Sequence, residues 1–226
     1  MPKLIDLTLP IADHFRWKVD RTLKAEHARG DQFQITWIGW TVHGFTHVDA
    51  PLHMLANGTT TSDFQLEQLV GPAAIVDLTD AVTSNEPITR ETIAERGGHI
   101  RRGDIVLLKT CWEERHSIAT PEFWTQAPWL TRESCEWLYA REIKALGVDF
   151  PQDEPIRHLL QSVVKPISEY VSHDVLLRRG VLLIEYLCNL RALRGPRTHL
   201  VALPLKVPDA DGAPARVIAM EEDASS

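Results

Sequence analysis

The amino-acid sequence predicts an α/β fold in which one mixed, barrel-like β-sheet is flanked by helices. Short runs of apolar and β-branched residues alternate with stretches of helical periodicity. They do not follow the rhythm of about 30 residues per βαβ unit that marks a parallel doubly wound sheet. No repeat and no linker divides the chain. We therefore expect residues 1–226 to form a single domain.

Seven strands are predicted from apolar and β-branched runs bounded by turn residues. The segment 33–42 alternates apolar and polar residues, as expected of a strand with one exposed face. The run 181–187 is apolar except at Glu185, which is typical of a strand buried on both faces. The predicted strands are residues 4–9, 32–43, 73–78, 105–109, 145–150, 181–187 and 200–206.

Four helices are predicted, at residues 89–96, 131–144, 156–163 and 167–179. The second has a clear start and end, because Thr131 can accept hydrogen bonds from the first free backbone amides and Gly147 follows the last turn. Its apolar stripe indicates a helix that covers the sheet and takes no part in chemistry. The acidic end of the chain, residues 221–226, is expected to fray.

Composition and charge argue against several function classes. The formal net charge is -7 and no long basic run occurs, so we expect neither a nucleic-acid partner nor binding to an anionic membrane. The N-terminus lacks the pattern of a secretory signal, and the longest apolar run is too short to span a bilayer. The three cysteines are widely spaced, which fits reduced thiols. These observations predict a cytoplasmic protein.

One eleven-residue segment holds three histidines and an aspartate at a spacing typical of a metal site. If the preceding strand continues, His43, His47 and Asp49 project from one face, because successive side chains alternate. Imidazole nitrogens and carboxylate oxygens are ligands that divalent transition metals prefer. Pro51 cannot donate to a sheet ladder, so His53 should lie on the following turn, where it could transfer protons. The other histidines are expected to have ordinary structural roles: His14, His27, His99, His116, His158 and His199.

Glu185 indicates a second cluster of polar residues. An ionised carboxylate in an apolar strand has to pair, bind a metal or neutralise. His173 lies twelve residues earlier, before a helix-to-strand turn that could bring the two side chains together. The alternative is a histidine exposed on a helix and a glutamate paired with Arg178, Arg179 or Arg191.

The segment 43–53 resembles the H-x-G-T-H-x-D-x-P-x-H signature of the cyclase family of metal-dependent hydrolases. This family includes bacterial kynurenine formamidase and isatin hydrolase. His173 and Glu185 match a downstream His and Glu of the family at the same separation. Further matches to the family cover nearly the whole chain: Asp6-Leu7-Thr8, residues 107–110, Gly147-Val148-Asp149, residues 202–206 and residues 212–217.

The resemblance implies an assignment of metal ligands. His43, His47 and Asp49 would bind a first ion. Asp49 would bridge to a second ion, held also by His173 and Glu185. The expected metal is Zn²⁺ or Mn²⁺, as one or two ions. The resemblance also implies an α/β arrangement around a barrel-like sheet, assembled as a homodimer or a dimer of dimers.

The resemblance implies hydrolysis of a C–N bond in an amide, formamide or lactam, or of a lactone, in a small aromatic substrate. A divalent ion lowers the pKa of water towards about 7, which makes hydroxide available at neutral pH. The resemblance implies that His53 is the general acid/base, and an imidazole pKa near ~6.5 suits that role. Trp17 and Phe45 could form an aromatic floor for a planar substrate, with simple packing as the alternative.

The chain departs from the family at positions that face the substrate. Phe45 stands where the family has glycine, and a glycine there would indicate special backbone geometry or close approach of substrate. The segment 16–20 lacks the Pro-Gly of a Trp-Pro-Gly-Asp loop, and residues 150–153 replace Thr-Pro-Ser-x-Asp. Two other functions stay open: a non-haem iron oxygenase with a His/carboxylate facial triad, and a non-catalytic metal-binding member.

Overall fold

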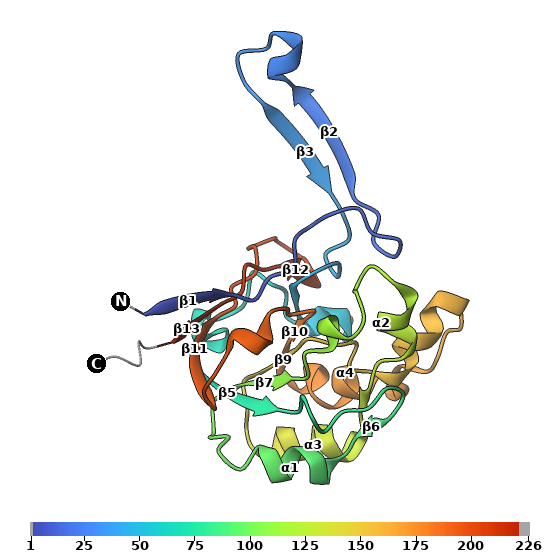
Figure 1. The fold of residues 1–226 in the computed structure, drawn as a ribbon, viewed down its shortest axis with the longest axis vertical. Helices are drawn as coiled ribbons and strands as arrows, with labels where there is room; N and C mark the ends of the chain where they lie inside the picture. Colours follow the sequence, from blue (N-terminus) through green and yellow to red (C-terminus); the bar gives the residue numbers. More distant parts are fainter. Residues whose placement is uncertain (1, 222–226) are drawn as a thin grey trace.

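The computed structural model describes residues 2–221 and contains one large mixed sheet that curls into a half-barrel (Figure 1). This confirms the predicted fold class. The acidic end at 222–226 lies outside the described residues. The strand order is β1-β13-β11-β5-β7-β9-β10-β4-β12. The strands are β1 Lys3–Asp6, β4 His47–Asp49, β5 Val70–Asp77, β7 Ile105–Lys109, β9 Ala145–Val148, β10 Leu182–Glu185, β11 Arg197–Val201, β12 Gly212–Pro214 and β13 Ile218–Glu221.

The middle of the sheet is parallel and buried on both faces. Strands β5, β7, β9 and β10 run parallel, and the strands beyond them are antiparallel. Along β7, Ile105 and Leu107 contribute to one hydrophobic core, whereas Val106 and Leu108 contribute to the other. Strand positions that feed two cores are apolar, as the four residues from Ile105 to Leu108 are, and Lys109 ends the strand. This is why the sequence predicted β7 with its observed bounds.

Helices cover one face of this sheet. The α-helices are α1 Arg90–Arg96, α2 Pro121–Thr125, α3 Arg132–Ala140 and α4 Val171–Val175. Short 3₁₀ helices connect the elements: His27–Arg29, Pro51–His53, Leu66–Gln68, Trp112–Glu114, Glu154–Gln161, Ile167–Glu169, Leu177–Arg179 and Leu190–Ala192. As predicted, Thr131 accepts a hydrogen bond from the backbone N–H of Ser134 and starts α3. The predicted helix 167–179 is instead split, because Tyr170 leaves helical geometry with ψ of 77°.

The predicted strand 32–43 is wrong in its extent. Strand β3 covers only Ile35–Gly39 and pairs with β2, Asp20–Ala25, in a separate two-stranded sheet. Figure 1 shows this hairpin projecting away from the rest of the molecule. The chain then turns, and β4 begins at residue 47. Because β2 is rich in polar residues, its sequence gives no apolar signal for a strand.

Several other boundaries differ from the prediction. The predicted strand 200–206 is shifted, since β11 ends at Val201 and Pro204 forms only an isolated bridge with Ala215. The short strands β12 and β13 were missed, as was a small parallel pair formed by β6, Pro87–Ile88, and β8, Trp129–Leu130. Within residues 2–221, no helix is both long enough and apolar enough to cross a membrane.

Candidate metal centre and active site

Two of the predicted metal ligands lie on β4, between β10 and β12. The register places Glu185 directly opposite His47, and Leu183 opposite Asp49. Opposed residues share a face, and residues two apart share a face, so His47, Asp49 and Glu185 point the same way. All three are buried, with exposed fractions of 0%, 1% and 4%. The sheet therefore brings two carboxylates and an imidazole together out of contact with bulk water.

His43 reaches this cluster from the turn before β4. Its Nδ1 lies 2.8 Å from Asp49 Oδ1, and His47 Nε2 lies 3.1 Å from the same oxygen. The structure thus brings the first three predicted ligands together, although the predicted reason, one continuous strand, is wrong. Phe45 adopts φ of 62° within the turn, the geometry that the family's glycine would favour. His43 also rests on Gly212, where an added Cβ would lie 2.9 Å from the ring.

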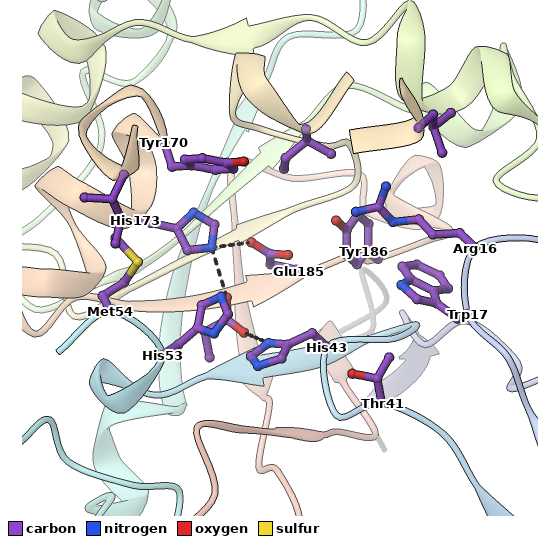
Figure 2. Close-up of a pocket in the computed structure, with 14 residues that line it drawn as sticks. Arg16, Trp17, Thr41, His43, His53, Met54, Tyr170, His173, Glu185 and Tyr186 are labelled. Carbon is purple, nitrogen blue, oxygen red and sulfur yellow. Dashed lines mark hydrogen bonds and ion pairs between the residues drawn. The ribbon is translucent and has the colours of Figure 1, made fainter. Parts of the chain in front are cut away.

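His173 on α4 completes the second predicted group (Figure 2). Its Nε2 lies 3.5 Å from Asp49 Oδ2 and 3.5 Å from Glu185 Oε1. Gln152 donates a hydrogen bond to Glu185. Glu185 has no arginine partner among residues 2–221. The three candidate arginines instead pair elsewhere: Arg178 with Asp174, Arg179 with Glu136 and Arg191 with Glu114.

Each of the three histidines is held so that one nitrogen faces the cluster. His47 Nδ1 donates to the carbonyl of Phe45 at 2.8 Å, and His173 Nδ1 donates to Asp153 Oδ2 at 2.5 Å. His43 Nε2 donates to Asp211 Oδ2 at 2.8 Å. An imidazole that donates through one nitrogen offers the lone pair of the other to a metal, and such outer partners fix the ligand geometry.

The cluster fits a divalent cation. His43, His47 and Asp49 each offer a ligand atom within 4.8 Å of the others, and so do Asp49, His173 and Glu185. His47 Nε2 and Asp49 Oδ2 are buried and lack a hydrogen-bond partner in the described part of the chain. Buried polar atoms rarely stay unsatisfied, and imidazole with carboxylate is a donor set for divalent transition metals.

The directions of the pKa shifts in the cluster agree with binding of a cation. Burial, and then the neighbouring charge of Asp49, raise the pKa of Glu185 above its ordinary value. Burial lowers the pKa of His43, but the carboxylates of Asp49 and Asp211 outweigh burial and raise it to about 9. Buried carboxylates that repel each other and favour positive charge on the neighbouring imidazole form a site that a cation would stabilise.

His53 ends the 3₁₀ helix that follows β4, on the turn where the sequence placed it. Its Nδ1 lies 3.4 Å from Asp211 Oδ2, its ring centroid lies 4.0 Å from that of His43, and its side chain is 34% exposed. Burial is the main cause of the lowered pKa of His53. A partly exposed imidazole with a lowered pKa is suited to exchange protons rather than to stay charged.

The cluster opens into a cavity of about 790 Å³, large enough for a small aromatic molecule. Its aromatic lining residues include Trp17, Tyr170 and Tyr186. Its polar lining residues include His43, His53 and Glu185. Phe45 is not among the described residues that line the cavity. It is buried behind Trp17, with ring centroids 4.9 Å apart. Of the two predicted aromatic residues, Trp17 lines the cavity and Phe45 supports it.

Sequence reasoning missed three polar residues of the site. Asp153 accepts a hydrogen bond from His173, and Gln152 donates one to Glu185. Asp211 contacts both His43 and His53. Residues 150–153 were read only as a departure from the family. Asp211 precedes the glycine of a recognised segment, but an aspartate in a loop gives no signal of its own.

Comparison with known proteins identifies the family. The model of the Cyclase family, described as "Putative cyclase", matches residues 5–155. The chain belongs to the Cyclase family. A kynurenine formamidase of Salinibacter ruber is 32% identical to this Cyclase-family chain over 181 residues, which are 79% of this chain and 76% of that protein.

Solved structures share the Cyclase fold. A structure described as a predicted metal-dependent hydrolase from Bacillus stearothermophilus has 28% identity and a TM-score of 0.75, over 98% of this chain and 100% of that chain. Isatin hydrolase A from Ralstonia solanacearum, at 23% identity, has a TM-score of 0.80 over 98% of this chain and 92% of that chain. This Cyclase-family protein is an enzyme, a metal-dependent hydrolase. The oxygenase and the non-catalytic alternatives are therefore disfavoured.

Proposed function

We propose that the enzyme hydrolyses a C–N bond in a small aromatic formamide, amide or lactam. The observation that carries the proposal is the buried His/carboxylate cluster that opens beside His53 into a cavity with aromatic walls. The kynurenine formamidase relative supports a formamide as the first substrate to test. A lactone is the secondary class, because it presents the same carbonyl group with an alkoxide leaving group.

We assign His43, His47 and Asp49 to a first ion, and Asp49, His173 and Glu185 to a second. Zn²⁺ or Mn²⁺ is proposed, since both accept imidazole and carboxylate ligands. When bound, such a cation supplies Lewis acidity for a carbonyl oxygen and makes water more acidic.

The protein's own contribution to proton transfer centres on His53. Asp211 lies beside Nδ1 of this imidazole, so Nε2 is the nitrogen free to act in the cavity. In the proposed mechanism Nε2 takes a proton from the attacking water and passes it to the departing amine. Trp17 provides a flat apolar wall that orients an aromatic ring and excludes water.

Two variants separate chemistry from metal binding. With Zn²⁺ or Mn²⁺ restored after chelation, wild type should hydrolyse a substrate from a panel of N-formylkynurenine, isatin and lactones. His53→Ala should lose about 10²–10⁴-fold in kcat while retaining the metal content of wild type. His47→Ala should lose both metal and activity, measured by elemental analysis and turnover. His199→Ala, on the exposed part of β11, is the matched control. Full activity of His53→Ala would remove this residue from the mechanism.

Location and assembly are also part of the proposal. Cys111, Cys135 and Cys188 are free thiols, and burial raises the pKa of Cys111 to about 11 and that of Cys188 to about 12. Thiols kept protonated in this way fit a reducing compartment such as the cytoplasm. We propose a homo-oligomer, a dimer or a dimer of dimers, with the projecting β2–β3 hairpin as its contact.

A further inference from the structure

Among the described residues that line the cavity there is one arginine, and it lies at the end remote from the proposed acid/base. Figure 2 shows Arg16 and Trp17 on one side of the cavity, with His53 and Met54 on the opposite side and Glu185 between them. Arg16 lies in the loop between β1 and β2 and is half-buried. Any substrate that reaches across the cavity from the metal ligands meets this guanidinium.

Arg16 is held in place by an aromatic ring rather than by a carboxylate. Its guanidinium carbon lies 4.5 Å above the Trp124 ring, which is fully buried. Within residues 2–221, no acidic side chain lies within 4.0 Å of Arg16, and no protein group accepts a hydrogen bond from its guanidinium. Arg132 and Arg157, in contrast, pair with Asp174 and Glu154. The guanidinium N–H donors of Arg16 are therefore available to a ligand, while the buried Trp124 ring holds the group in place.

Two tyrosines line the cavity, Tyr186 beside Arg16 and Tyr170 beside His173. Burial raises the pKa of both Tyr170 and Tyr186, and the charge of Arg16 partly offsets this for each hydroxyl. Tyr186 lies beside the guanidinium in Figure 2. A planar cation next to a phenolic O–H donor matches the needs of a carboxylate, which accepts two parallel hydrogen bonds from arginine.

We propose that Arg16 binds a carboxylate of the substrate, so that the enzyme acts on anionic aryl amides or formamides whose carboxylate lies away from the scissile bond. This inference rests on the proposed function and specifies its substrate class. Arg16 is the arginine among the described residues that line the cavity, which makes it the docking point that we assign to the carboxylate. Neutral substrates of the same shape would leave the guanidinium without a partner.

The test compares N-formylkynurenine with its carboxamide, which lacks the negative charge. Metal-loaded wild type should prefer the acid by about 10- to 100-fold in kcat/KM, the range expected for one hydrogen-bonded charge pair. Arg16→Gln should abolish this preference by raising KM for the acid alone, and Arg16→Lys should restore part of it. Arg102→Gln, an exposed arginine outside the site and the hairpin, is the matched control. An unchanged preference in Arg16→Gln would overturn the proposal.

Failure of the proposed function would be visible separately. If wild type hydrolyses neither compound, calorimetry of kynurenine and kynurenine amide binding to the metal-loaded protein decides the question. Tighter binding of the acid that disappears in Arg16→Gln would support the anion site without the formamidase activity. Equal affinities, or a preference that survives in Arg16→Gln, would overturn it.

Discussion

Asp211 contacts two imidazoles of the candidate site, those of His43 and His53. Its Oδ2 accepts a hydrogen bond from His43 Nε2 at 2.8 Å and lies 3.4 Å from His53 Nδ1. The backbone of Asp211 is itself fixed, because its carbonyl accepts from the Ala50 N–H at 2.9 Å. One carboxylate therefore orients a proposed ligand and the proposed acid/base together.

Asp211→Asn should weaken metal binding by about 10-fold, the lower end of the range for outer-shell partners. The amide oxygen can still accept the hydrogen bond from His43, but it lacks the charge that strengthens it. Competition with a chromophoric chelator measures the affinity. Asp209→Asn, an exposed neighbour, should leave it unchanged. If both variants bind metal like wild type, Asp211 has no role in holding His43.

Phe45 combines a buried ring with a backbone conformation that suits glycine. Its φ is 62°, and its ring is 4% exposed and packs on Trp17. A left-handed conformation costs a non-glycine residue roughly 1–2 kcal/mol. The chain accepts this cost while burying an aromatic side chain behind the cavity wall.

Comparing the stabilities of two truncated variants tests this backbone strain. Both Phe45→Ala and Phe45→Gly lose the ring, but only glycine relieves the backbone. Phe45→Gly should therefore be the more stable of the two by about 1 kcal/mol in urea unfolding. At Phe123, within α2, the order should reverse, because glycine weakens a helix by roughly 0.5–1 kcal/mol relative to alanine. The same order at both sites would contradict a strained Phe45.

At the level of strands, an ion pair ties β5 and β7 to the segment before β11. Lys109 is only 9% exposed, and its Nζ lies 2.9 Å from Asp77 Oδ2 and donates to the carbonyl of Leu193 at 3.1 Å. Burial raises the pKa of Asp77, but hydrogen bonds from Thr79 and Lys109 outweigh it and lower the pKa below 3.8. The ionised carboxylate is thus the form that stabilises the fold.

Asp77→Asn should reduce the free energy of unfolding at neutral pH by up to about 1 kcal/mol, since Asp77 is partly exposed. The folded-state pKa is depressed, so the contribution of Asp77 is present above pH 3.8 and lost as pH falls through the folded value. The gap between wild type and variant should be constant from about pH 5 to 7 and shrink below about pH 4. Urea unfolding across this range, with Asp13→Asn as control, measures it. A gap that widens in acid would contradict the assignment.

At the scale of the whole molecule, the projecting β2–β3 hairpin lies away from the hydrophobic core. Apolar side chains on the projecting hairpin are exposed, including Phe33 at 69%, Ile35 at 51% and Trp37 at 48%. An isolated two-stranded hairpin is at best marginally stable in water. A second copy of the chain that covers this surface would stabilise it, in keeping with the proposed homo-oligomer. The single domain of residues 1–226 stays a prediction.

Light scattering after size-exclusion chromatography tests the hairpin contact. Wild type should elute as a dimer or larger, and the double substitution Phe33→Ser with Trp37→Ser should shift it towards monomer, because both remove apolar contact area. Val164→Ser removes an apolar side chain that is 87% exposed elsewhere, and it should not change the mass. A monomeric wild type would refute the proposed assembly.

The clustering of candidate ligands could be predicted from the chain because metal binding restricts residue types and spacing. His43, His47 and Asp49 follow from their spacing, whereas His173 and Glu185 needed the resemblance to the Cyclase family, and the role of all five as ligands stays a prediction. In the same way β7 was predicted with its observed bounds, because burial on both faces demands an uninterrupted apolar run.

Tertiary structure alone decided how these residues meet. The turn at Phe45, and not a continuous strand, brings His43 to Asp49. It uses a left-handed backbone conformation that a phenylalanine in the sequence does not predict. Asp211 reaches His43 across 168 residues of chain, and Arg16 is held by a tryptophan 108 positions away. Such contacts depend on which segments the sheet and its loops place side by side. Local periodicity carries no information about them, because the free energy that fixes them comes from packing between distant parts of the chain.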